Sequence, residues 1–308
     1  MSDWTEVKIS VDAKDVDRAA DIAMMVVPYG IYIEDYRDLE QQAWDIAHID
    51  LIDEDLLKKD RSKAFVHVYI APQENPLEAV AFLRERYTAE GIENEIDLSA
   101  CKNEDWENNW KQYFHSIPVG KKLLIHPTWE EDYDSQGRVV LDIEPGLAFG
   151  SGSHETTRLC LAALENHVDE SKELLDIGCG SGILSVAGLL LGAKSAVGVD
   201  IDALAVANAR ENAKTNGFDE TKFKVFQGNL TDKVEGKFDI VVANIVADII
   251  IMFCKDVGNF MKDGAVFITS GIIDTRENDV LAAFEKYGFE VIARHAEKGW
   301  VCFECLKK

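Results

Sequence analysis

Residues 172–202 read KELLDIGCGSGILSVAGLLLGAKSAVGVDID and contain the clearest pattern in the chain. Residues 173–177 form a short apolar run that predicts a strand, and three alternating glycines follow it. Residues 183–191 are an apolar run long enough for a buried helix. A second apolar strand, residues 195–199, leads directly to Asp200. The segment is therefore predicted to be a β-α-β unit with a carboxylate at the tip of its second strand.

The turn of this unit holds Gly178, Gly180 and Gly182, and glycines let a backbone approach a ligand closely. Asp200 can accept hydrogen bonds from both ribose hydroxyls of a nucleoside. Asp176 stands two residues before the first glycine, where its charge would repel the pyrophosphate that the spacing G-x-G-x-x-G binds. It suits a ligand with a positive end, such as a sulfonium nucleoside that carries an amino acid. The pattern resembles the first motif of the class I S-adenosylmethionine methyltransferases.

The composition is that of a globular protein with room for two domains: 308 residues, 29% charged and 47% hydrophobic. The net charge of −24 argues against a protein that grips the phosphate backbone of nucleic acid, because such a protein needs a basic surface. The acid excess favours a basic partner, such as a ribosomal or histone-like protein. The alternative is that the charge serves solubility alone.

The sequence predicts a cytoplasmic protein without a membrane span, because it has no signal-like start and no apolar run of membrane-spanning length. The six cysteines are scattered, so reduced thiols are expected. Cys302 and Cys305 form a C-x-x-C, but in a strand this offset directs the two side chains to opposite faces. No second pair accompanies them, and no metal site is predicted.

The first hundred residues alternate strand and helix in two β-α-β units, which predicts a ferredoxin-like α+β domain over residues 1–100. The expected strands are residues 6–11, 30–35, 64–70 and 92–98, and the expected helices are residues 13–27 and 76–89. An acidic loop with Trp44 lies between the units. Residues 101–114 carry aromatic side chains at helical spacing, so we assign residues 101–120 to a linker helix.

Residues 121–308 are predicted to form the cofactor-binding domain, with a Rossmann-like seven-stranded sheet. Two adjacent strands end the domain, which fits the methyltransferase sheet, where the last strand inserts antiparallel, and not a plain dinucleotide fold. Further strands are expected at residues 121–126, 139–143, 223–226, 238–242, 265–270, 289–293 and 300–306. Further helices are expected at residues 203–216, 249–261 and 277–287.

Two further features lie where open α/β sheets bind ligands, at the carboxyl ends of the strands. The turn with Asn229 and Leu230 follows the next expected strand, residues 223–226. Asn244 lies at the tip of the strand after that, residues 238–242.

A glycine-rich loop, residues 146–153, precedes the β-α-β unit and can fold over the ligand. Ser153 or Thr156 is expected to cap the helix that follows. His154 could be a base or a ligand, but a lone histidine is more often a structural hydrogen-bonding residue.

With these residues in place, the chain resembles the ribosomal protein L11 methyltransferases over nearly its whole length. The most specific segments are residues 145–157 (PGLAFGSGSHETT), 176–182 (DIGCGSG) and 243–247 (ANIVA). The family usually has Thr at the position of Ser151 and often Pro at that of Glu155. The resemblance implies S-adenosylmethionine as cofactor and lysine and N-terminal amines of ribosomal protein L11 as substrate. The first domain resembles the family's substrate-recognition module.

The resemblance also implies the site residues, taken over by motif. The implied cofactor contacts are Thr157, Gly178, Asp200 and Asn244, with Phe149, Thr156 and Gly180 beside them. We add Asp176, Ile201, Asn229 and Leu230 at the same sheet edge, and expect a monomer. Asn244 is our candidate catalytic residue, because its amide oxygen can orient the amine; bracing of the loop or the cofactor is the alternative role.

Several other functions remain open at this point. A methyltransferase that acts on another protein, on a glutamine amide or on RNA would keep the cofactor motifs, although Asn244 lacks the Asn-Pro-Pro-aromatic context of the amide and base-amine enzymes. A nicotinamide-dependent dehydrogenase shares the β-α-β unit, but Asp176 and the glycine spacing disfavour it. A non-catalytic ribosome-assembly factor would bind the partner without turnover. A glycine-rich turn of another α/β domain is the simplest alternative.

Overall fold

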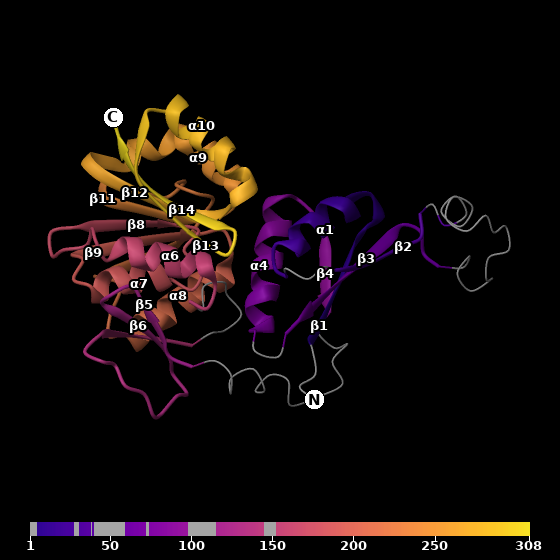
Figure 1. The fold of residues 1–308 in the computed structure, drawn as a ribbon, viewed down its shortest axis with the longest axis horizontal. Coiled ribbons are helices and arrows are strands. Elements are labelled where there is room, and N and C mark those ends of the chain that lie inside the picture. Colours follow the sequence, from indigo (N-terminus) through magenta and orange to yellow (C-terminus); the bar gives the residue numbers. More distant parts are fainter. Residues whose placement is uncertain are drawn as a thin grey trace. The chain divides into compact units, whose positions relative to one another are not determined.

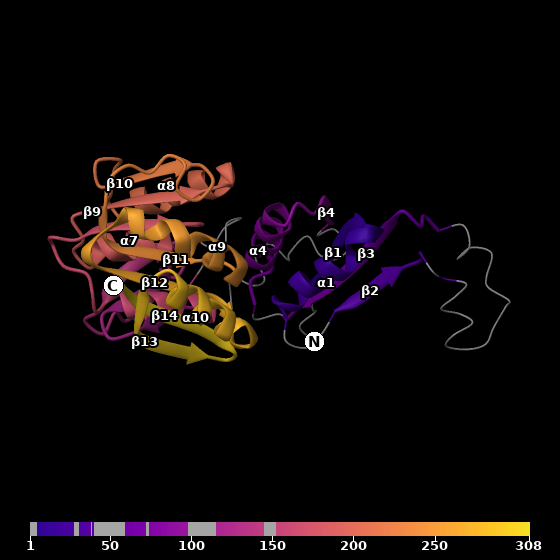
Figure 2. The same ribbon diagram turned by 90° about the horizontal axis from the view of Figure 1, so that it is seen from above.

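The computed structural model of the chain describes residues 5–27, 31–37, 39, 59–71, 74–97, 115–144 and 152–308. The chain divides into two compact units, residues 1–114 and 115–308 (Figures 1 and 2). The acidic loop around Trp44 and the helix predicted at residues 101–114 lie outside the described residues.

The first unit is a ferredoxin-like sandwich, as predicted, because its β-α-β-β-α-β chain forms one antiparallel sheet in the order β2-β3-β1-β4. The strands are β1 (Thr5–Asp12), β2 (Tyr32–Asp35), β3 (Lys63–Ile70) and β4 (Asn94–Asp97), and the helices are α1 (Val16–Met24) and α4 (Pro76–Ala89). Val7, Ile9 and Val11 alternate along β1 and are fully buried, which is the period of a strand with one covered face.

The two helices of this unit begin in different ways. The Asn75 side chain accepts a hydrogen bond from the N–H of Leu77, and Pro76 takes the first helical position of α4, where its missing N–H is harmless. The helix predicted at residues 13–27 is shorter than expected. It opens as a 3-10 turn, Ala13–Asp15, before α1 begins, and no side chain of the described residues caps α1.

The second unit is built on a seven-stranded sheet in the order β10-β9-β8-β11-β12-β14-β13. The strands are β8 (Glu173–Ile177), β9 (Ser195–Asp200), β10 (Phe223–Gln227), β11 (Phe238–Asn244), β12 (Met261–Ile273), β13 (Phe289–Glu297) and β14 (Trp300–Lys307). The last strand, β14, lies antiparallel between β12 and β13. This is the methyltransferase arrangement that the two closing strands predicted.

Five helices cover the two faces of this sheet (Figure 1). They are α6 (Glu155–Leu164), α7 (Ile183–Leu190), α8 (Ala203–Thr215), α9 (Ala247–Val257) and α10 (Glu277–Lys286). The core on one face joins α6, α7 and α8, and the core on the other joins α9 and α10. Cys302 belongs to the first core and Cys305 to the second, so the prediction that they point to opposite faces is confirmed.

A small three-stranded sheet precedes α6 and corrects the linker prediction. It consists of β5 (Ile117–Val119), β6 (Leu123–Pro127) and β7 (Val139–Ile143), with β5 antiparallel and β7 parallel to β6. Residues 117–119, which we assigned to a linker helix, are therefore a strand. Pro118 lies between two β-branched residues, and proline is tolerated on an edge strand, where its missing N–H leaves no ladder bond unmade.

The prediction of a helix at residues 249–261 is also wrong at its carboxyl end. The helix α9 stops at Val257, a 3-10 turn over Gly258–Phe260 follows, and Met261 already belongs to β12. Glycine favours such an end because it weakens a helix. No helix among the described residues is long and apolar enough to cross a membrane.

Glu173, at the amino end of β8, provides a test of how charges hold the sheet. It lies 2.8 Å from the Nζ of both Lys194 and Lys262, and hydrogen bonds from these ammonium groups lower its pKa from 4.5 to about 2. A lowered folded pKa gives stability that is full above about pH 4.5 and is lost as the pH falls through about 2. We expect Glu173→Gln to cost about 1–2 kcal/mol at pH 7, after allowance for screening, and the difference to vanish near pH 2.

Urea unfolding of wild type and Glu173→Gln from pH 2 to 7 measures this difference. Glu211→Gln is the matched control, because that carboxylate is exposed and pairs with Lys214 at 3.9 Å within one helix. Its effect should stay below about 0.5 kcal/mol. Equal stability of Glu173→Gln and wild type at pH 7 would contradict the role of this ion cluster.

Candidate functional site

The carboxyl ends of β8, β9 and β11 meet where the strand order reverses, between β8 and β11. Ile177 pairs with Val199 on one side and with Ala243 on the other. The next residues along the three strands are Gly178, Asp200 and Asn244. The register therefore places these three predicted site residues at one level of one sheet edge.

Asp176 is buried on the face covered by α7. Its Oδ2 accepts a hydrogen bond of 2.8 Å from the Ser185 hydroxyl of that helix, and the side chain is 0% exposed. Its Oδ1 is buried and has no hydrogen-bond partner within the part of the chain that the structure describes. Burial raises the pKa of Asp176 from 3.8 to about 7, and the charge of Asp200 adds to the rise. A buried, unpaired carboxylate oxygen is a site that a cation would stabilise.

Asp200 is bound to the glycine turn. Its Oδ2 accepts the Gly180 N–H at 2.8 Å and its Oδ1 the Asp202 N–H at 2.9 Å. A carboxylate has about four acceptor positions, so both oxygens can still accept a hydroxyl. Burial raises its pKa. Gly178 has φ +68° and its added Cβ would lie 2.5 Å from the Cγ2 of Ile245, so only glycine fits there.

The ends of β9 and β10 bring three more of the predicted residues together. The Gly228 N–H donates to the Asp200 carbonyl at 2.9 Å, which holds the turn with Asn229 and Leu230 beside β9. Ile201 is 45% exposed, an apolar surface directly beside Asp200. Leu230 has φ +48° and packs against the core of α9 and α10, whereas Asn229 is exposed.

Asn244 lies on the face covered by α6. Its Nδ2 donates to the Thr157 hydroxyl at 3.3 Å, and its buried Oδ1 meets no hydrogen-bond partner in the described ranges. Thr157 is 0% exposed and Thr156 is 1% exposed. The amide is therefore oriented by its nitrogen, and its oxygen remains as a second buried acceptor at the sheet edge.

The start of α6 corrects the predicted cap. Neither Ser153 nor Thr156 caps the helix: the Nδ1 of His154 accepts the Thr156 N–H at 3.3 Å and lies 2.8 Å from its hydroxyl. An imidazole nitrogen replaces the usual hydroxyl or carboxylate acceptor. The ring also packs edge-on against Trp300, with 5.0 Å between centroids. His154 thus makes structural contacts as the cap of α6 and as a neighbour of Trp300.

Glu155, the first residue of α6, joins this helix to the β13–β14 hairpin. Its carboxylate lies 2.9 Å from the Nζ of Lys298 and 3.1 Å from Arg158, which in turn pairs with Glu297 at 2.8 Å. The predicted glycine-rich loop before α6, including Phe149, lies outside the described residues up to residue 151. The described residues contain no group of three or more His, Cys, Asp or Glu side chains suited to a metal ion.

Sequence reasoning missed the residues that support this edge from neighbouring elements. Ser185 carries the hydroxyl of an otherwise apolar helix. This signal could have identified it as a buried hydrogen-bond partner of Asp176. The Thr269 hydroxyl donates to the Ala243 carbonyl at 3.0 Å, and Gly271 allows β12 to approach Ile245. Nothing near these positions in sequence points to β11.

Gly271 provides a test of how the edge is held. It has φ +84°, and an added Cβ would lie 2.3 Å from the Ile245 carbonyl oxygen. Because this contact is with backbone, we expect Gly271→Ala to displace Ile245 and Asn244, to destabilise the protein by about 2–4 kcal/mol and to reduce ligand affinity.

Gly264→Ala is the matched control for that substitution. Gly264 lies in the same strand at φ +75°, but an added Cβ would meet no atom of the described residues within 4 Å. It should cost only about 1 kcal/mol of backbone strain. Thermal unfolding and ligand titration of both variants measure the effect, and equal behaviour of the two would show that the contact with Ile245 is unimportant.

Comparison with known proteins agrees with this geometry. Residues 3–308 match the family model described as "Ribosomal protein L11 methyltransferase (PrmA)". The chain is 38% identical over 310 residues to the ribosomal protein L11 methyltransferase of Clostridium perfringens (strain SM101 / Type A), and 36% identical over 311 residues to that of Clostridium botulinum (strain Alaska E43 / Type E3). Each alignment covers 97% of both chains.

A solved structure shows the same relationship. The ribosomal protein L11 methylase from Lactobacillus delbrueckii subsp. bulgaricus superposes with a TM-score of 0.60 at 30% identity, covering 63% of this chain and 100% of that one. The resemblance inferred from the motifs is therefore confirmed, and the chain belongs to the ribosomal protein L11 methyltransferase family.

Proposed function

We propose that this chain transfers methyl groups from S-adenosylmethionine to lysine side-chain and N-terminal amines of ribosomal protein L11. The observation that carries the proposal is the pair of buried acceptors, Asp176 Oδ1 and Asn244 Oδ1, that have no hydrogen-bond partner among the described residues and lie at the reversal point of the sheet. One suits the ammonium group of a cofactor and the other an incoming amine. The family membership supplies the substrate class.

The residues at the sheet edge fit the three parts of the cofactor. Asp176 would pair with the ammonium group, Asp200 would accept the ribose hydroxyls, and Ile201 offers an apolar surface for the base. Gly178, Gly180, Thr156, Thr157, Asn229 and Leu230 complete the binding residues that we propose, with Phe149 from outside the described residues. When bound, S-adenosylmethionine supplies a methyl group on a positively charged sulfur.

The chain must present its substrate amine in the neutral form. A lysine amine has a pKa of roughly 10.4, so neutralising it at pH 7 costs about 4.6 kcal/mol, whereas an α-amino group near 8 needs far less. An apolar, water-poor site reduces this cost. Asn244 Oδ1 would accept a hydrogen bond from the amine and direct its lone pair at the methyl group, which is positioning catalysis. The proton leaves to bulk water.

The partner and the setting follow from the charge of the chain. Its net charge of −24 suits a basic ribosomal protein as substrate, recognised through the ferredoxin-like first unit. The same charge disfavours direct binding of nucleic acid. We propose a monomer that acts in the cytoplasm, where ribosomal proteins are made.

Incubation of the purified chain with radiolabelled S-adenosylmethionine and a total extract of ribosomal proteins tests this proposal. We expect one labelled band, and mass spectrometry should identify methylated amines on ribosomal protein L11. Label on a different protein would overturn the proposal that ribosomal protein L11 is the substrate. Binding of the cofactor without label would favour an assembly role, and absence of cofactor binding would exclude a methyltransferase.

A further inference from the structure

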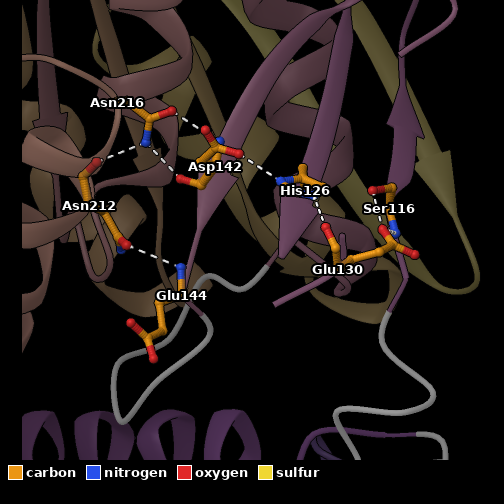
Figure 3. Close-up of polar contacts among 7 residues, drawn as sticks. All are labelled: Ser116, His126, Glu130, Asp142, Glu144, Asn212 and Asn216. Atoms are coloured by element: carbon orange, nitrogen blue, oxygen red, sulfur yellow. Dashed lines mark hydrogen bonds and ion pairs between the residues drawn. The ribbon is translucent and has the colours of Figure 1, made fainter. Parts of the chain in front are cut away.

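Asn212 of α8 and Asn216, the residue that caps the carboxyl end of this helix, take the place of a neighbouring strand along the edge of β7 that pairs with no described strand (Figure 3). Asn216 Oδ1 accepts the Asp142 N–H at 3.0 Å, and its Nδ2 donates to the carbonyl of the same residue at 2.6 Å. Asn212, one helical turn earlier, accepts the Glu144 N–H on its Oδ1 at 3.3 Å. A side-chain amide has the donor and acceptor of a peptide group, so the pair satisfies the backbone of an edge strand.

Asn212 differs from Asn216 in one further contact. Its Nδ2 donates to the Ser181 carbonyl at 2.9 Å, inside the glycine turn of the candidate site. Asn212 is 3% exposed and Ser181 is 2% exposed, so this hydrogen bond is shielded from water. The N–H of Gly180, the residue before Ser181, donates to Asp200. One buried amide thus joins the end of β7 to the turn that orients Asp200.

The chain of polar contacts continues away from the site on the other side of β7 (Figure 3). His126 Nδ1 lies 2.6 Å from Asp142 Oδ1, and its Nε2 lies 2.8 Å from the Glu130 carbonyl. The Glu130 carboxylate accepts the Ser116 N–H at 2.8 Å and the Ser116 hydroxyl. β7 is therefore held from both sides, which makes it a firm anchor for Asn212.

We propose that Asn212 is a positioning residue for cofactor binding, which holds the glycine turn in its binding conformation through Ser181. The inference rests on the proposed function of this site. A buried amide with both groups bonded fixes one arrangement of the segments that it joins, because any shift leaves a polar group unpaired. A turn that is already in place loses less conformational entropy when a ligand binds, so affinity rises.

Three variants separate this role from a general effect on stability. Asn212→Ala removes both contacts of the amide. Asn212→Asp keeps an acceptor for the Glu144 N–H but places a carboxylate oxygen against the Ser181 carbonyl. Asn216→Ala is the matched control, because it removes the amide that follows α8 and binds the same strand edge, together with its 2.8 Å hydrogen bond to the Asn212 carbonyl, without touching the glycine turn.

Calorimetric titration with S-adenosylhomocysteine and hydrogen exchange of the unliganded proteins provide two readouts. We expect Kd to rise about tenfold in Asn212→Ala and at least as much in Asn212→Asp, but less than twofold in Asn216→Ala. The kcat with saturating cofactor should stay near the wild-type value in all three. Amides of residues 180–185 should exchange faster in the two Asn212 variants only.

Unchanged Kd and unchanged exchange in the Asn212 variants would overturn the inference, as would equal losses in Asn216→Ala. If Asn212→Ala does not fold, Asn212→Asp and Asn216→Ala still provide the comparison. Failure of the wild-type chain to bind S-adenosylhomocysteine would refute the proposed function instead. Hydrogen exchange, which needs no ligand, would still report whether Asn212 orders the glycine turn.

Discussion

Replacement of Asp176 by asparagine is expected to weaken the binding of S-adenosylhomocysteine roughly 100-fold at pH 8, because it removes the charged partner of the ligand's ammonium group. The same change should stabilise the unliganded protein at that pH. The folded pKa of about 7 exceeds the ordinary 3.8 by roughly 3 units, which corresponds to about 4 kcal/mol at 1.36 kcal/mol per unit. An acid whose pKa is raised in the folded state does not reduce the free energy of unfolding at a pH below its unfolded pKa. It reduces that free energy by the full amount at a pH above its folded pKa.

The pH dependence of affinity gives the sharper readout for Asp176. The ammonium group pairs with the ionised carboxylate, so below about pH 7 binding must first expel a proton. Wild-type Kd should therefore rise about tenfold for each pH unit below 7 and level off above it. In Asp176→Asn this slope should disappear. Calorimetry from pH 5.5 to 8.5 measures both curves, and a flat wild-type curve would contradict the assigned role.

Asp202→Asn is the matched control for Asp176→Asn. It removes a neighbouring carboxylate at the same sheet edge but keeps an N-cap acceptor for the Leu204 N–H, since asparagine caps helices as well as aspartate does. Its Kd should keep the wild-type slope with pH. A similar flattening in both variants would indicate a general field effect instead of a direct contact with Asp176.

The local pattern of the sequence was sufficient to predict single elements in both units of the chain. β8 and α4 have the predicted bounds, because apolar runs and glycine or proline boundaries act within a few residues. Asp176, Asp200 and Asn244 could be placed at one edge because strand ends in a parallel sheet share a level. The family resemblance supplied Thr157, whose contact with Asn244 joins residues 87 positions apart.

The supporting contacts could not be predicted, because they join segments that are distant in sequence. Asn212 and Glu144 are 68 residues apart, and neither has a neighbour that indicates the other. The strand β5 was missed because three residues that include proline carry almost no strand pattern. The His154 cap was missed because histidine is not among the usual capping residues. Such features depend on tertiary packing more than on local preference.

Replacement of Asn244 by alanine is expected to reduce kcat about 100-fold with saturating cofactor, while the Kd of the cofactor changes less than about threefold. The reason is that Oδ1, which is buried and has no partner among the residues that the structure describes, would contact the amine in the transition state. Loss of one positioned hydrogen bond has an effect of this size. A variant that loses only cofactor affinity would show that Asn244 binds the cofactor instead.

Two further variants assign the effect to the orientation of the amide. Thr157→Val removes the hydroxyl that accepts the hydrogen bond from Asn244 Nδ2 at 3.3 Å, but it keeps Asn244 Oδ1. We therefore expect a smaller loss in kcat, of about fivefold. Ser270→Ala is the matched control: Ser270 lies opposite Asn244 on β12, and its hydroxyl donates to Val301, away from the site. Its kcat should stay near the wild-type value despite a loss of about 1 kcal/mol in stability.

Wild-type turnover of Asn244→Ala, measured as initial rates of methyl transfer to ribosomal protein L11, would refute a catalytic role for this amide. The expected order of loss is Asn244→Ala, then Thr157→Val, then Ser270→Ala, because Asn244 Oδ1 would contact the amine, the Thr157 hydroxyl acts through Asn244, and the Ser270 hydroxyl is bonded to Val301. General loosening of the sheet edge would affect all three alike.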